Sequence, residues 1–188
     1  MIGKSELALY HTGFFEIKKP QIDYGRKNAD FGQGFYLSPD REFAQKWSGE
    51  RKDQKTYMNI YTLDTSELKI KTLERGEEWY DYIMRNRRGQ ADIFSDYDVI
   101  TGPVANDTLY NTWGFATSGF LSSAQSLELL KIGPEYTQTV LKTPLAADKL
   151  CWKESVIFTG EELSRFRETV KKEEEIYIKE FTELFNSL

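Results

Sequence analysis

The sequence predicts an α+β domain, because short strand patterns and amphipathic helix patterns alternate irregularly along the chain. The strand patterns are rich in aromatic and β-branched residues and cover residues 7–11, 34–37, 57–63, 97–101, 137–142 and 155–159. No Gly-x-Gly-x-x-Gly follows the first strand and no phosphate-binding loop with Lys-Ser/Thr is present, which disfavours the two common nucleotide-binding α/β folds. A length of 188 residues fits one domain.

Capping residues and apolar spacing predict where the helices lie. Ser38, Pro39 and Asp40 supply an N-cap, a proline at the first helical position and an acid in the first turn, so a helix is predicted from Pro39 to about Ser48. Apolar residues at helical spacing predict three more helices, over residues 77–88, 108–118 and 123–131.

A long amphipathic helix is predicted over residues 159–188. Thr159 and Glu162 form a capping-box pattern, and apolar residues follow at three-, four- and seven-residue steps. These residues are Leu163, Phe166, Val170, Tyr177, Phe181 and Leu184. We expect this helix to pack on the domain formed by residues 1–158, and a partner-binding helix is the alternative.

Composition describes a folded and acidic protein. The hydrophobic fraction is 39% and the net charge is −5, so a nucleic-acid target would need a local basic patch. Arg85, Arg87 and Arg88 are the candidates for such a patch, and a solvated helix end is the favoured interpretation of these arginines. The single cysteine, Cys151, excludes an intrachain disulfide and is expected to be a buried thiol.

Several classes of protein find no support in the sequence. The N-terminus has no signal-peptide pattern and no stretch has the length of a membrane span, so a cytoplasmic location without membrane contact is expected. One histidine and one cysteine far apart give no metal-ligand spacing, so no metal is expected. A Gly-x-Ser-x-Gly nucleophile elbow is absent as well.

Two segments carry the functional argument. The first, Tyr10-His11-Thr12-Gly13, ends an apolar strand and holds the single histidine. The second is the glycine-framed Asp30-Phe31-Gly32-Gln33-Gly34-Phe35-Tyr36-Leu37. A polar ring beside a flexible glycine, with an aromatic residue on a second strand, is an arrangement that can clamp a flat, charged ring. Arg26 lies in the polar loop between the segments, where its guanidinium suits paired phosphate oxygens.

These segments resemble the motifs of the ADP-ribosyltransferase superfamily, in particular its poly(ADP-ribose) polymerase-type members. Those motifs read aromatic-His-x-Gly and Phe-Gly-x-Gly-apolar-Tyr, and a helix then holds a second aromatic residue, usually tyrosine. Trp47 occupies that last position, eleven residues after Tyr36. With the block from Tyr97 to Ala105 and a late strand led by glutamine, the chain looks like a bacterial family of unknown function grouped with these enzymes, over roughly residues 6–158.

The resemblance implies an ADP-ribosyltransferase-like fold, in which two small, mostly antiparallel sheets form an NAD⁺ cleft flanked by helices. It implies that His11 hydrogen-bonds an NAD⁺ ribose, that the Gly13 backbone meets the carboxamide, and that Tyr36 and Trp47 hold the nicotinamide ring. The implied cofactor-binding set also includes Thr12, Arg26, Gly34 and Phe35. A structural role stays the alternative for His11, and core packing stays the alternative for both Tyr36 and Trp47.

The third motif departs from the family pattern. The usual glutamate at the start of a late strand is matched by Gln138. An amide can hydrogen-bond a ribose hydroxyl, but it cannot take a proton and supplies no negative charge. Either the target supplies its own nucleophile, or another carboxylate serves as a catalytic group. Asp107 and Glu135 are the candidates, and a helix N-cap is an equal alternative for Asp107.

The resemblance thus implies an NAD⁺-dependent mono-ADP-ribosyltransferase, a bacterial toxin or defence effector that modifies a protein or nucleic-acid acceptor. An antitoxin or immunity protein is the partner expected for such an effector. Two alternatives stay open: an NAD⁺ glycohydrolase, and a catalytically inactive module that binds NAD⁺, ADP-ribose or a partner.

Overall fold

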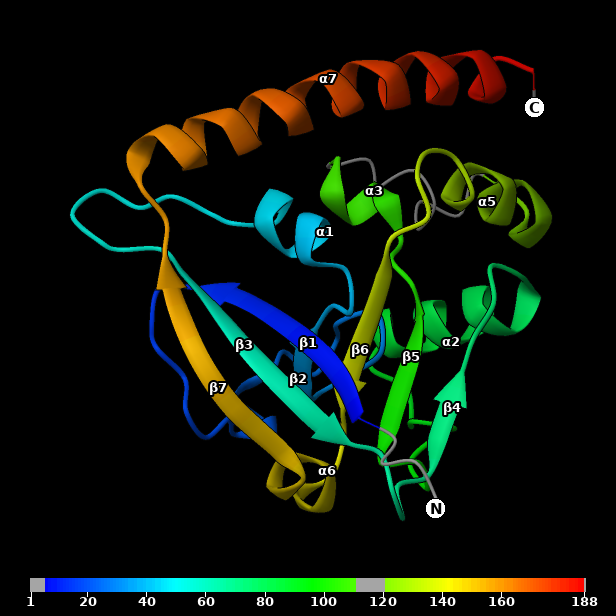
Figure 1. The fold of residues 1–188 in the computed structure, drawn as a ribbon. Helices are drawn as coiled ribbons and strands as arrows, with labels where there is room; N and C mark the ends of the chain where they lie inside the picture. Colours follow the sequence, from blue (N-terminus) through cyan, green and yellow to red (C-terminus); the bar gives the residue numbers. More distant parts are fainter. Residues whose placement is uncertain (1–5, 111–120, 188) are drawn as a thin grey trace.

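The protein is an α+β domain, which confirms the predicted class. The structure is a computed structural model and describes residues 6–110 and 121–187 (Figure 1). Its elements in chain order are β1 (Glu6–Gly13), the 3-10 turn η1 (Ile22–Tyr24), β2 (Phe35–Leu37), α1 (Arg41–Lys46), β3 (Tyr57–Asp64), β4 (Ile70–Thr72), α2 (Glu77–Arg87), β5 (Val99–Pro103), α3 (Asn106–Leu109), α5 (Ser123–Leu130), β6 (Thr137–Leu141), α6 (Pro144–Asp148), β7 (Leu150–Ile157) and α7 (Gly160–Phe185).

The strands form two mostly antiparallel open sheets. The first has the order β1-β3-β7, and the second has the order β2-β6-β5-β4, in which only the β4–β5 pair is parallel. A single antiparallel bridge joins β1 to the segment after β2, because the backbone groups of Tyr10 and Ser38 exchange hydrogen bonds of 2.8 and 2.9 Å. The histidine strand and the glycine-framed strand therefore meet at this junction.

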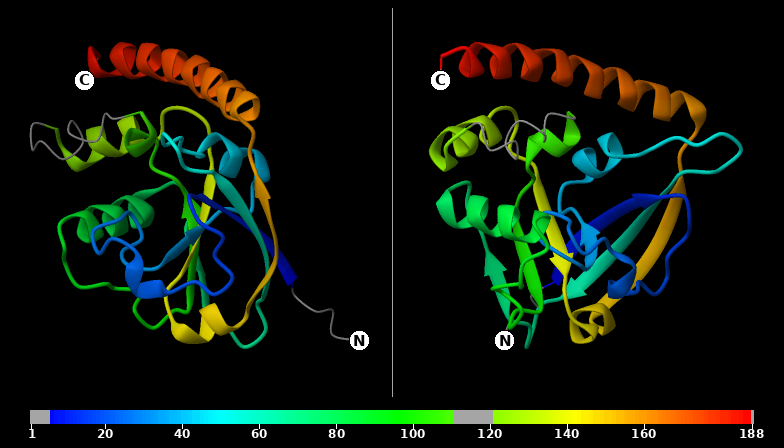
Figure 2. Two further views of the ribbon diagram at one scale, coloured as in Figure 1. Left: turned by 90° about the vertical axis from the view of Figure 1, so that its left-hand side faces the viewer. Right: turned by 180° about the vertical axis from the view of Figure 1, so that it is seen from behind.

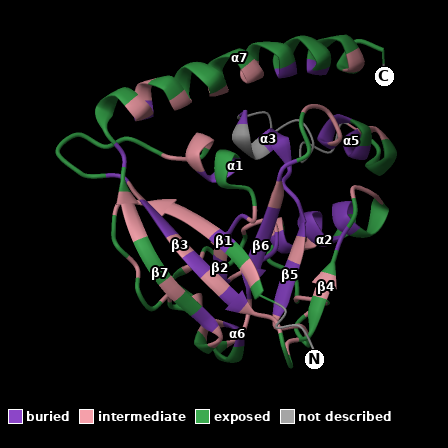
Figure 3. Cartoon of the chain, in the orientation of Figure 1, coloured by how far each residue is buried: buried purple, intermediate pink, exposed green. Residues whose placement is uncertain are grey.

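The core occupies the space around this junction. One cluster contains Leu9, Phe35, Tyr61 and Leu141, which come from both sheets. A second cluster lies under α2 and contains Phe31, Trp79 and Ile83. Figure 3 shows buried residues concentrated in β3, β5, β6 and α2. Apolar burial from four separate chain segments thus fixes how β1 and β2 are placed relative to each other.

Helix α7 runs along one end of the molecule, over α1 and α5 (Figures 1 and 2). Thr159 caps it in a capping box with Glu162, as predicted. The predicted inward face is confirmed, since Leu163, Tyr177 and Phe181 are buried. Within residues 6–110 and 121–187, no helix combines the length and apolar character needed to cross a membrane.

Several predicted boundaries were displaced. Helix α1 begins at Arg41 and is capped by Asp40, whose carboxylate accepts from the amides of Glu42 and Phe43. Ser38 lies before the N-cap: its backbone forms the bridge to Tyr10, and its hydroxyl donates to the Thr137 carbonyl and accepts from the Asp40 amide. Strand β7 begins at Leu150, earlier than predicted, and β4 and α6 were not predicted. Of the predicted helix 108–118, residues 111–120 lie outside the described residues, and α3 begins earlier, at Asn106.

Two side-chain expectations were wrong. Cys151 is exposed, and it lies on β7, which is an edge strand of its sheet. Arg87 is not part of a solvated helix end. Its guanidinium pairs with Asp30 and Asp107, and only 11% of its side chain is exposed. This arginine holds together the buried carboxylate of Asp107 and the partly buried carboxylate of Asp30.

Candidate functional site

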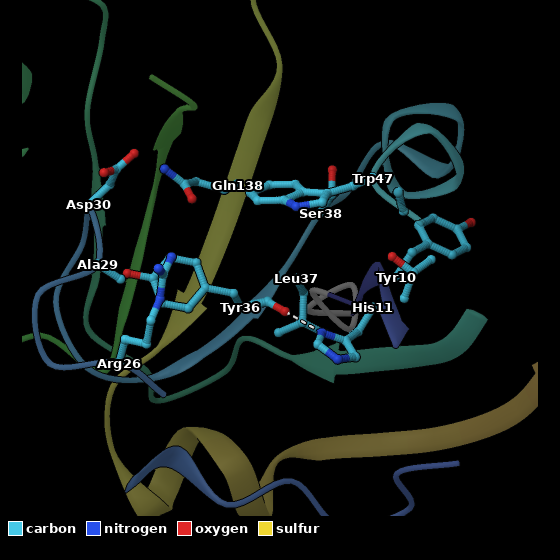
Figure 4. Close-up of a pocket in the computed structure, with 12 residues that line it drawn as sticks. Tyr10, His11, Arg26, Ala29, Asp30, Tyr36, Leu37, Ser38, Trp47 and Gln138 are labelled. Atoms are coloured by element: carbon cyan, nitrogen blue, oxygen red, sulfur yellow. Dashed lines mark hydrogen bonds between the residues drawn. The ribbon is translucent and has the colours of Figure 1, made fainter. Parts of the chain in front are cut away.

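A cavity of about 260 Å³ opens where β1 and β2 meet (Figure 4). Strand β1, the loop before β2, β2 itself, α1 and β6 all contribute to its walls. The lining residues are Tyr10, His11, Thr12, Arg26, Ala29, Asp30, Tyr36, Leu37, Ser38, Ala44, Trp47 and Gln138. The structure therefore brings together six of the residues predicted from the sequence: His11, Thr12, Arg26, Tyr36, Trp47 and Gln138.

His11 is held in one orientation by the neighbouring strand. Its Nδ1 lies 2.8 Å from the carbonyl oxygen of Tyr36, and its ring contacts Phe35 with centroids 4.7 Å apart. A carbonyl only accepts, so Nδ1 carries the proton and Nε2 keeps a lone pair. Loss of water around the ring lowers the pKa of His11 below its ordinary value of 6.5. At neutral pH the imidazole is therefore a neutral hydrogen-bond acceptor at Nε2.

Tyr36 presents its ring to the cavity while its hydroxyl is engaged elsewhere. The hydroxyl donates to the Gly32 carbonyl at 2.7 Å and accepts from the Phe31 amide at 2.9 Å. Burial, with a further contribution from the negative charge of Asp30, raises the pKa of Tyr36 well above its ordinary value of 10.0. The Tyr36 side chain is thus neutral. Its ring forms one wall of the cavity, and its hydroxyl anchors the loop before β2.

Trp47 and Arg26 form the outer rim. Trp47 is the C-cap of α1, contacts Phe43 with ring centroids 5.0 Å apart, and remains 45% exposed. Arg26 is also exposed. Both residues line a second cavity under α7, where Lys46, Tyr136 and Glu173 form a hydrogen-bonded cluster. Because Trp47 is so exposed, core packing alone does not explain its position.

Gln138 lies at the inner end of the cavity, on β6. It is 2% exposed, and its amide nitrogen makes one long contact of 3.4 Å with the carbonyl of Pro103. In Figure 4 the Gln138 amide and the Asp30 carboxylate are drawn toward the same side of the cavity. This amide offers hydrogen bonds without adding charge.

The glycines of the two motifs have different roles. A Cβ on Gly13 would lie 3.3 Å from Nε2 of His11, so Gly13 keeps that nitrogen accessible. A Cβ on Gly34 would lie 2.5 Å from the Leu141 carbonyl, so Gly34 allows β2 to approach β6. Phe35 is buried in the core between the sheets. Gly13, Gly34 and Phe35 support the cavity and are not among the residues that line it.

The candidate carboxylates Asp107 and Glu135 do not line the cavity either. Asp107 accepts hydrogen bonds of 2.7 and 2.9 Å from Arg87, and 2% of its side chain is exposed. It does not cap α3, whose N-cap is Ala105. Glu135 is exposed, in the turn before β6.

Asp30 is the acidic lining residue to which the sequence had assigned no role. Its Oδ1 accepts from Nε of Arg87 at 2.8 Å, and 12% of its side chain is exposed. Asp30 directly precedes the Phe-Gly-x-Gly motif, and this position could have pointed to it. Only the glycines and aromatic residues of the segment were assigned roles.

The model of the family described as "Protein of unknown function (DUF3990)" matches residues 7–152. The chain belongs to the DUF3990 family. No curated protein and no solved structure matched it. The matched residues of this DUF3990 chain contain every residue that lines the main cavity and end before α7 begins.

The cavity of this DUF3990 chain combines aromatic surface with a few fixed polar groups, which is typical of small-molecule sites. Among the described residues, no group of three or more His, Cys, Asp or Glu side chains is arranged to hold a metal. The polar residues that line the cavity include a neutral acceptor on His11, a cation on Arg26, an amide on Gln138 and a carboxylate on Asp30. Such a set can orient a ligand that carries hydroxyl, phosphate and cationic ring groups.

Proposed function

We propose that this chain is an NAD⁺-dependent mono-ADP-ribosyltransferase and that its two sheets form an ADP-ribosyltransferase-like fold. Support comes from four chain segments that meet at one cavity. His11, Tyr36, Trp47 and Gln138, which match the successive family motifs, all line it. In this proposal NAD⁺ is the substrate, and an ADP-ribosyl group passes to a macromolecular acceptor.

One observation carries the proposal: a neutral, oriented imidazole and a fixed aromatic ring line the same cavity. The lone pair on Nε2 of His11 suits a ribose hydroxyl as donor. The ring faces of Tyr36 and Trp47 suit the flat, cationic nicotinamide ring of NAD⁺. Arg26 supplies a guanidinium that suits the pyrophosphate. One ribose, the nicotinamide ring and the pyrophosphate thus each have a chemical counterpart in the cavity.

The acceptor in this proposal is a protein or a nucleic acid, and the biological role is that of a bacterial toxin or defence effector. The net charge of −5 favours a protein acceptor over a long polyanion. An effector of this kind needs a neutralising partner in the cell that makes it, which is the expected role of an antitoxin or immunity protein.

A second candidate is an NAD⁺ or ADP-ribose binding module without turnover. Gln138 favours it, because an amide in place of the family glutamate can bind a ribose hydroxyl but supplies no negative charge to a cation. Release of free nicotinamide separates the two candidates, since only an enzyme cleaves the glycosidic bond. Free ADP-ribose without a modified acceptor would identify a glycohydrolase.

The proposal is tested by incubating the purified protein with labelled NAD⁺ and cell lysate. We expect label on a macromolecule and free nicotinamide, with both lost in His11→Ala and Tyr36→Ala. Tyr24→Ala is the matched control, because Tyr24 is 85% exposed and does not line the cavity. Unchanged labelling in folded His11→Ala and Tyr36→Ala protein would reject the proposal.

A further inference from the structure

The cavity holds one carboxylate, and it is not at the position of the family glutamate. Of the described residues that line the cavity, Asp30 alone is acidic. Gln138 is neutral, and Asp107 and Glu135 lie outside the lining. Among the described lining residues, Asp30 is therefore the one that can present a negative charge to a ligand.

The Asp30 side chain is held at one end of a charged cluster. Arg87 donates from Nε to Asp30 and from its two terminal nitrogens to Asp107. One guanidinium between two carboxylates gives these three groups a net charge of −1 when both are ionised. Asp107 is the buried end of the cluster, and Asp30 is the end that reaches the cavity.

The backbone around Asp30 is fixed as well. The Asp30 carbonyl accepts from Nδ2 of Asn86 at 3.0 Å. The next residue, Phe31, is fully buried, and its carbonyl accepts from the ammonium group of Lys142. The Tyr36 hydroxyl makes two hydrogen bonds to the same turn, since it accepts from the Phe31 amide and donates to the Gly32 carbonyl. Such a support restricts the carboxylate to a narrow range of positions, which is what electrostatic catalysis requires.

Burial, together with the nearby charge of Asp107, raises the pKa of Asp30, and the guanidinium of Arg87 opposes this effect. A carboxylate with a raised pKa is a stronger base than an ordinary one. Gln138 cannot act in this way at any pH.

We propose, on the basis of the transferase function proposed above, that Asp30 supplies the catalytic carboxylate that Gln138 lacks. The bond between the ribose anomeric carbon and the nicotinamide nitrogen breaks, and its electron pair leaves with neutral nicotinamide. The negative charge of Asp30 stabilises the cation shared by the anomeric carbon and the ring oxygen. A lone pair of the acceptor forms the new bond to the anomeric carbon, and the acceptor proton passes to Asp30 and then to solvent. Arg87 acts as a positioning residue.

The test compares Asp30→Asn with Asp107→Asn. Each replacement removes one carboxylate from Arg87 and keeps the side-chain shape, but only Asp30 reaches the cavity. The readouts are the rate of nicotinamide release at saturating NAD⁺, NAD⁺ affinity by calorimetry, and folding by circular dichroism. We expect Asp30→Asn to lose at least about a hundredfold in rate with affinity changed less than about threefold. Asp107→Asn should stay within about fivefold in rate, since it leaves the Asp30 carboxylate in the cavity and removes only a partner of Arg87 and one neighbouring charge.

Asp30→Glu provides a rescue, because it restores the carboxylate and should regain at least about tenfold in rate over Asp30→Asn. Equal losses in folded Asp30→Asn and Asp107→Asn would show that the cluster is structural and would overturn the assignment. A rate in Asp30→Asn within about tenfold of wild type would overturn it as well. Wild-type protein that binds NAD⁺ without releasing nicotinamide would refute the transferase function, and this inference would fall with it.

Discussion

The imidazole of His11 donates a hydrogen bond from Nδ1 to the backbone carbonyl of Tyr36, over 2.8 Å and across 25 positions of sequence. This bond couples the two motifs directly. Because the acceptor is a backbone atom, substitution of the Tyr36 side chain leaves the partner of His11 in place. The orientation of the imidazole and the position of the aromatic wall can therefore be tested independently.

Stability should depend on pH through His11. The folded pKa of His11 lies below 6.5, so as pH falls from about 6.5 the unfolded chain takes up the proton first. The contribution of His11 to stability is therefore present above pH 6.5 and is lost as pH falls toward the folded pKa. Urea unfolding of wild type and His11→Gln at several pH values checks this, since the chain has one histidine. A difference between the two proteins that does not change with pH over this window would contradict it.

Tyr36→Phe should destabilise the protein while keeping the aromatic wall. It removes both hydrogen bonds that join the hydroxyl to the Phe31 amide and the Gly32 carbonyl. We expect a loss of about 1–3 kcal/mol in the free energy of unfolding, measured by urea titration. Equal stability of Tyr36→Phe and wild type would show that the hydroxyl does not secure this turn.

Alanine at the two motif glycines should separate folding from ligand binding. Gly34→Ala places a Cβ 2.5 Å from the Leu141 carbonyl and should cost about 3 kcal/mol of stability. Gly13→Ala places a Cβ 3.3 Å from Nε2 of His11, so it should change stability by less than about 1 kcal/mol. Gly13→Ala should instead weaken NAD⁺ binding in calorimetry. Unchanged affinity in Gly13→Ala would indicate that Nε2 does not face the ligand.

Trp47→Ala should weaken NAD⁺ binding by about tenfold, because the cation loses one aromatic face. The folded state should change little, since Trp47 is 45% exposed. Trp47→Tyr is the matched variant, as it restores the ring that the resembled family usually has. Calorimetric affinity that is equal in Trp47→Ala, Trp47→Tyr and wild type would exclude Trp47 from the binding site.

Local signals predicted much of the fold. Helix α7 was predicted because Thr159 and Glu162 form a capping box that depends only on neighbouring residues. Helix α1 was placed too early, because Ser38 is drawn into a bridge with Tyr10, a contact between distant segments that no local pattern contains. Helix α6 is only five residues long and therefore gave no periodic signal.

In the candidate site as well, some residues were predicted from local patterns and others depend on contacts between distant segments. His11, Tyr36 and Trp47 were singled out because motif spacing places ring-bearing residues in recognisable positions. Asp30 received no role and Arg87 was given the wrong one, because their roles depend on a tertiary ion pair that spans 57 positions. Arg87 has the appearance of a surface residue in sequence, since nothing near it in the chain reveals the buried Asp107 that it meets.

The most direct test is a crystal structure with a non-hydrolysable NAD⁺ analogue bound. We expect the nicotinamide ring against Tyr36 and Trp47, a ribose hydroxyl within hydrogen-bonding distance of Nε2 of His11, and the Asp30 carboxylate facing the anomeric carbon. An analogue bound in the second cavity under α7, or elsewhere on the surface with the cavity beside His11 empty, would contradict the account.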